Sequence, residues 1–122
     1  MGRDFSIGRL NSTCKGTSYI MCQMVKLVSQ IKDGVDIDNI PHKDKHISTE
    51  QLAIIIQSLK NDLTTVYYDS ELKTKFVDVY KFYDEDTFEE VYENCKMACD
   101  LFVDALVDSI LNKEDKVYWN YV

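Results

Sequence analysis

The sequence predicts an all-α protein, a compact bundle of four to five helices around a central hydrophobic helix at about residues 86–112. Hydrophobic residues recur at helical spacing through most of the chain after residue 16. One proline and four glycines leave few of the turn residues that a many-stranded protein needs. With 122 residues, of which 45% are hydrophobic, the chain fits one domain with a core. We therefore expect an irregular N-terminal arm over residues 1–16 and a single helical domain over residues 17–122.

The first helix is predicted to begin at Thr17 and to end before Gly34, which suits the left-handed conformation that terminates helices. Its main apolar face comprises Ile20, Met24, Leu27, Val28 and Ile31. The loop that follows contains Pro41 and both histidines of the chain, His42 and His46.

The second helix has the clearest start signal in the chain. Ser48 and Gln51 have the spacing of a capping box, and Ile47 and Leu52 flank it as a hydrophobic staple. This helix is predicted to run to Tyr67 or Tyr68. A shorter helix follows over residues 70–84, with Leu72, Phe76, Val79, Tyr80 and Tyr83 on one face. Its β-branched and aromatic content leaves a strand as the alternative for residues 75–83.

The last helix is predicted to begin with Asp86 as its N-cap and to run to Asn112. Apolar residues cover most of its circumference, and a single polar column remains. The column comprises Asp100, Asp104 and Asp108. That pattern indicates a helix nearly enclosed by its neighbours, with the column as its solvated edge.

The aromatic tail, residues 113–122, is expected to dock on the body of the domain.

Charge and composition exclude several classes of partner. The formal net charge of −7 argues against nucleic acid and against an anionic membrane surface. No apolar run is long enough for a membrane span. The first ten residues lack the apolar segment of a secretory signal, so we expect an intracellular, cytoplasmic protein with reduced thiols. Whether a membrane anchor follows the last residue is left open.

No motif points to an enzyme, a metal or another cofactor. Cys95 and Cys99 lie one helical turn apart on the apolar face, where a free cysteine commonly acts as a small hydrophobic residue. A zinc site would need two further ligands, and Cys14 and Cys22 lack the spacing of a second pair. His42 and His46 lie four residues apart, but a mixed site would require the tertiary structure to bring them to the cysteines. The chain lacks a glycine-rich phosphate loop, a nucleophile elbow and a zincin pattern. We therefore expect a non-enzymatic protein without cofactors.

Two stretches carry a resemblance to a known family. LAIIIQSLKNDL, residues 52–63, is similar to a BH3-type helix in the spacing of Leu52, Ile56, Leu59 and Leu63. TFEEVYE, residues 87–93, resembles the Phe-Glu-x-Val entry into the BH1 region. With these stretches, about half of the chain resembles the Bcl-2 family, and in particular its compact viral members. The resemblance implies a viral inhibitor of apoptosis that sequesters a BH3 helix of a host protein in a hydrophobic groove.

The predicted groove follows from that resemblance, since groove-binding modules hold an amphipathic partner helix by its aliphatic anchors. Two alternatives remain open: a self-associating structural protein, for example a homodimer, and a small carrier of an apolar ligand. The predicted groove residues are Ile55, Ile56, Leu59, Leu63, Phe76, Val79, Tyr80, Phe88 and Val91.

Overall fold

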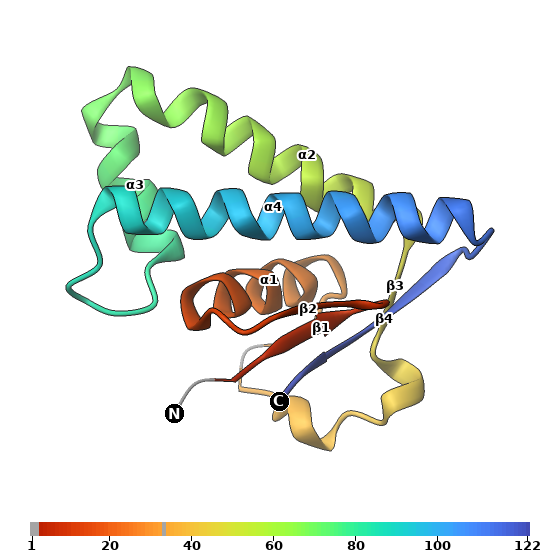
Figure 1. Ribbon diagram of the computed structural model, residues 1–122. Coiled ribbons are helices and arrows are strands. Elements are labelled where there is room, and N and C mark those ends of the chain that lie inside the picture. Colours follow the sequence, from red (N-terminus) through yellow and green to blue (C-terminus); the bar gives the residue numbers. More distant parts are fainter. Residues whose placement is uncertain (1–2, 33) are drawn as a thin grey trace.

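The protein is a mixed α/β structure, so the prediction of an all-α bundle is wrong. The computed structural model describes residues 3–32 and 34–122. These residues form four α-helices and one four-stranded antiparallel sheet (Figure 1). The helices are α1 (Lys15–Val28), α2 (Thr49–Thr65), α3 (Ser70–Tyr80) and α4 (Phe88–Leu111). The strands are β1 (Phe5–Ile7), β2 (Leu10–Ser12), β3 (His46–Ser48) and β4 (Lys116–Tyr121).

The sheet joins the two ends of the chain in the strand order β2-β1-β4-β3. β4 pairs with β1 on one side, where Ile7 lies opposite Trp119, and with β3 on the other, where Ile47 lies opposite Val117. β1 and β2 form a hairpin within residues 1–16, for which the sequence predicts an irregular arm. The predicted arm is therefore wrong for residues 5–12, and the aromatic tail docks as a central strand.

The sheet presents one face to the helices. Along β4, Val117, Trp119 and Tyr121 are buried, whereas Lys116 and Tyr118 are exposed. This alternation is the period-two pattern of a half-buried strand. The helices lie on one side of the sheet, and the segment with the short helices η1 (Ile37–Asn39) and η2 (His42–Asp44) runs on the other side (Figure 1).

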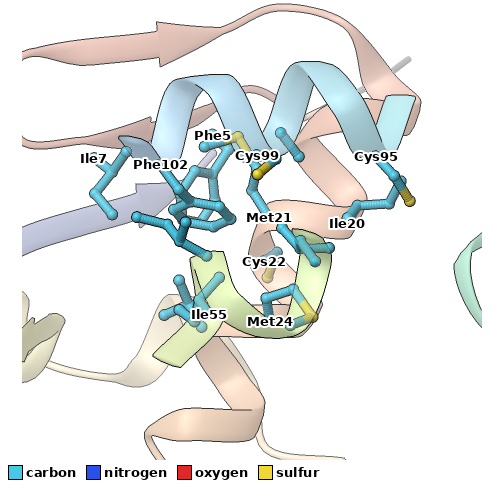
Figure 2. Close-up of a cluster of buried hydrophobic side chains, with 14 of the residues drawn as sticks. Phe5, Ile7, Ile20, Met21, Cys22, Met24, Ile55, Cys95, Cys99 and Phe102 are labelled. Carbon is cyan, nitrogen blue, oxygen red and sulfur yellow. The ribbon is translucent and has the colours of Figure 1, made fainter. Parts of the chain in front are cut away.

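The core lies between the sheet and the helices. Figure 2 shows side chains from β1, α1, α2 and α4 converging there. Cys22, Cys95 and Cys99 are free thiols within it, and burial raises the pKa of each. The two α4 cysteines thus behave as apolar core residues, as the sequence predicted. The largest fully buried side chains include Trp119, Phe5, Phe102, Ile20, Leu52 and Leu59.

α4 is the helix that contacts most of the other elements: α1, α2, α3 and the sheet. Its apolar circumference is nevertheless not enclosed, because Val107, Ile110 and Leu111 are exposed. The prediction that neighbouring elements nearly enclose this helix is therefore wrong for its last turns. Its N-cap is Thr87, whose hydroxyl accepts from the Glu90 backbone N–H at 3.2 Å.

The start of α2 is confirmed, whereas the predicted ends of α1 and α2 are wrong. The capping box of Ser48 and Gln51 is present with both hydrogen bonds. α3 is a helix rather than the alternative strand. α2 ends earlier than predicted, at Thr65, and continues as the 3-10 helix η3 (Val66–Tyr68). α1 stops well before Gly34, because Gln30 already adopts the left-handed conformation with φ 56°.

Candidate functional site

Most of the predicted groove residues belong to the core. Ile55, Ile56, Leu59 and Val91 are buried, and the partly buried Leu63 and Phe88 pack against the same cluster. An amphipathic pattern identifies the face that a helix buries, and here that face is already covered by the protein itself. The remaining three residues, Phe76, Val79 and Tyr80, do line a surface hollow.

This hollow is one half of a groove between three helices. The first half lies between α2 and α3 and has a volume of about 170 Å³. The second half extends to α1 and has a volume of about 400 Å³. Asp62, Val79 and Tyr80 line both halves, so the two hollows adjoin at these residues. We call this feature the three-helix groove.

The floor and rim of the three-helix groove are largely apolar. Met24, Phe76 and Tyr80 are buried and form its floor. Leu27 from α1 and Val79 from α3 are on its rim, with exposed fractions of 71% and 65%. Two exposed aliphatic side chains from different helices that line one hollow differ from the scattered exposed apolar residues of an ordinary surface. The groove can therefore bury apolar anchors of a ligand.

The polar side of the groove comes from α2. The Tyr80 hydroxyl donates a hydrogen bond to Asp62 Oδ2 at 2.7 Å. Burial and the neighbouring Asp62 carboxylate raise the pKa of Tyr80, so this phenol stays protonated and acts as a donor. Asp62 is thereby held in place. Lys75 is exposed at the rim and forms no ion pair with any residue that the structure describes.

Local structure explains why α3 lies beside α2. The short helix η3 continues α2 for three residues, and the chain then reverses at Asp69. The Asp69 carboxylate accepts from the Glu71 backbone N–H at 2.8 Å and so starts α3. Phe76 then packs against aromatic residues of α4, with ring centroids 5.9 Å from Phe88. The reversal leaves α2 and α3 splayed enough to form the groove.

A larger hollow of about 650 Å³ lies at the start of α1. It contains the exposed thiol of Cys14, whose Sγ donates to Asn94 Oδ1 at 3.6 Å. Burial alone would raise the pKa of Cys14, but hydrogen bonds from the side chain and backbone of Thr17 and from the Gly16 backbone outweigh it and lower that pKa. No histidine lines this hollow, so it offers no base of the kind that activates catalytic thiols.

Two kinds of site are absent from the part of the chain that the structure describes. In residues 3–32 and 34–122, no three His, Cys, Asp or Glu side chains are grouped so that they could hold a metal ion. No helix among these residues combines the length and the apolar character needed to cross a bilayer. No family model, curated protein or solved structure matches this chain. Interpretation of the three-helix groove therefore depends on its own geometry.

Proposed function

We propose that the protein is a non-enzymatic binding module that holds an amphipathic helix of a partner protein in the three-helix groove. The observation that carries this proposal is a pair of exposed aliphatic side chains, Leu27 and Val79, from two helices that line one hollow with the buried Met24 and Tyr80. A partner helix would place its aliphatic anchors against these side chains.

The charges at the groove favour a partner helix over a small apolar ligand. Lys75 offers an unpaired ammonium for an acidic side chain beside the partner's anchors. Polar α2 residues that line the groove, Ser58 and Asn61, can hydrogen-bond to polar residues along the helix edge. An enclosed carrier cavity would instead be walled by apolar groups on all sides.

The relation to the Bcl-2 family is narrower than the sequence resemblance implies. That resemblance implies an all-α fold, whereas this chain contains an antiparallel sheet. The part of the hypothesis that we retain is the mode of recognition, with a BH3-type helix as the first partner to test. The site differs from the one predicted: α1 supplies one rim, and α2 contributes its polar side rather than Ile55, Ile56 and Leu59.

The test is titration of labelled amphipathic helical peptides, including a BH3-type panel, against the protein and a Leu27→Asp/Val79→Asp variant. Both residues are exposed, so the fold should tolerate the change. We expect at least one peptide to bind with a Kd of about 1 μM or below, and the double variant to bind it at least about tenfold more weakly. Leu59 is unsuitable for such a test, because it is fully buried and a charge there would disrupt the core.

Ile54→Asp is the matched control, because Ile54 is exposed on α2 but does not line the groove. This variant should bind like the unmodified protein. Equal binding by the double variant, or no binding to any peptide, would contradict the proposal. A dimeric elution volume that Leu27→Asp/Val79→Asp converts to that of a monomer would assign the groove to a second copy of the chain instead.

A further inference from the structure

A second surface lies on the last turns of α4, away from the three-helix groove. Val103, Val107, Ile110 and Leu111 follow the i, i+4, i+7, i+8 spacing of a single helical stripe. Val103 is half-buried, and the other three are exposed, with Ile110 at 61% and Leu111 at 76%. We call these four residues the α4 stripe. α3, which lines the groove, packs on the start of α4 through Phe76 and Phe88, whereas the α4 stripe occupies the last turns of that helix (Figure 1).

One edge of the α4 stripe is acidic. Asp100 and Asp104 stand three residues before Val103 and Val107, which places each carboxylate beside an apolar side chain. Both aspartates are exposed, and neither forms an ion pair with a residue that the structure describes. Asp108 differs, because Arg9 in the β1–β2 turn pairs with it at 2.6 Å. Among the residues that the structure describes, Arg9 is thus the one cation paired with the column, and Asp100 and Asp104 have no ion-pair partner.

We infer that the α4 stripe docks a basic amphipathic helix of another protein, with Lys or Arg residues along the edge that meets Asp100 and Asp104. Apolar residues of such a helix would cover Val107, Ile110 and Leu111, while its basic residues would neutralise the free carboxylates. This surface is additional to the three-helix groove, so the protein would join two partner helices.

Charge decides between this partner and a second copy of the chain. In an antiparallel dimer about a two-fold axis, the acidic edges of both stripes lie on the same side of the interface. Like charges in one interface oppose association, and each copy carries a net charge of −7. Lys96, one turn before Asp100, is the nearest lysine on this face of α4 and forms no ion pair among the described residues. A basic helix meets none of this repulsion.

The experiment uses a designed peptide of about 20 residues, with leucines on one helical face and lysines along one flank. A matched peptide carries glutamates in place of the lysines. Binding to the full chain is measured by fluorescence anisotropy at low and at physiological salt. We expect the lysine peptide to bind at least about tenfold more tightly than the glutamate peptide, with a preference that shrinks as salt rises.

Variants locate the interaction. Asp100→Asn/Asp104→Asn should weaken binding of the lysine peptide by about fivefold or more and reduce the salt dependence of that binding. Ile110→Asp should abolish binding. The matched control is Glu89→Gln/Glu93→Gln, which removes two exposed carboxylates at the same spacing from the first half of α4. Circular dichroism confirms that each variant folds. Three results would overturn the inference: binding that is unchanged in Asp100→Asn/Asp104→Asn, equal binding of both peptides, or no binding at all.

Discussion

At the scale of single residues, the contact between Gly16 and Asn94 fixes the approach of α1 to α4. A Cβ added at Gly16 would overlap the side-chain amide of Asn94. The Asn94 amide also accepts from Thr17 Oγ1 at 3.4 Å, so it cannot turn away without losing a partner. At Gly16, α1 therefore leaves room for the Asn94 side chain of α4 because it has no side chain of its own.

Gly16→Ala should lower the free energy of unfolding by about 1 kcal/mol or more, because the overlap outweighs the better helix propensity of alanine. The measurement is urea denaturation of a double-mutant cycle with Asn94→Ala. In the Asn94→Ala background, Gly16→Ala should be neutral or stabilising. A destabilisation of the same size in both backgrounds would show that Asn94 is not the obstacle.

Asp86 accepts backbone hydrogen bonds in the structure, but not as the cap of the last helix. The sequence predicts it as the N-cap of the last helix, and acids do suit that position. In the structure its carboxylate accepts from the Phe82 and Tyr83 backbone N–H groups, both at 2.9 Å, and thereby closes the turn after α3. The cap passes to Thr87. Asp86 and Thr87 are both residue types that favour the N-cap position. Thr87 takes that position because the Asp86 carboxylate is already bonded within the turn.

At the scale of elements, the strands were missed although β4 carried a readable signal. Val117, Trp119 and Tyr121 alternate with polar or exposed residues, which is typical of a half-buried strand. β1, β2 and β3 are only three residues each, too short for a periodicity to be recognised. Gly8, with φ +58°, turns β1 into β2, and a lone glycine between Ile7 and Arg9 does not predict a hairpin.

Trp119→Ala tests whether the sheet is integral to the fold. Trp119 is buried and stacks on Phe5, with ring centroids 6.1 Å apart. Its truncation should cost about 3–5 kcal/mol of unfolding free energy. Tyr118→Ala, on the exposed face of the same strand, should cost less than about 1 kcal/mol. Similar losses for both variants in chemical denaturation would contradict the alternation of β4.

At the scale of the whole molecule, the thiol-rich core makes stability depend on pH. Burial raises the pKa of Cys22 from 9.0 to about 11, and it raises the pKa of Cys95 further. Above pH 9 the unfolded chain loses thiol protons that the folded chain retains. The unfolded state then binds fewer protons, so the free energy of unfolding decreases as pH rises. The contribution of Cys22 is fully present below pH 9 and is lost as pH rises through about 11.

Urea denaturation between about pH 8 and pH 10 should therefore show a decline approaching about 1 kcal/mol per pH unit for each buried thiol. Cys22→Ala lowers stability at every pH by leaving a cavity, but its slope with pH should be shallower. Cys14→Ala is the control, since its thiol is exposed and its pKa is lowered rather than raised. An unchanged slope in Cys22→Ala would show that Cys22 does not titrate on unfolding.

Local patterns were enough to predict the four helices, much of their apolar faces and the thiols that enter the core, because helical periodicity and capping are local properties. The sequence did not predict the sheet, because β1 and β4 come from opposite ends of the chain and form only by pairing with each other. It also did not place the groove. The apolar face of α2 packs inward against α4 and the sheet, so the surface that remains for a partner is the one between α1, α2 and α3. Only tertiary packing decides which apolar residues are left uncovered.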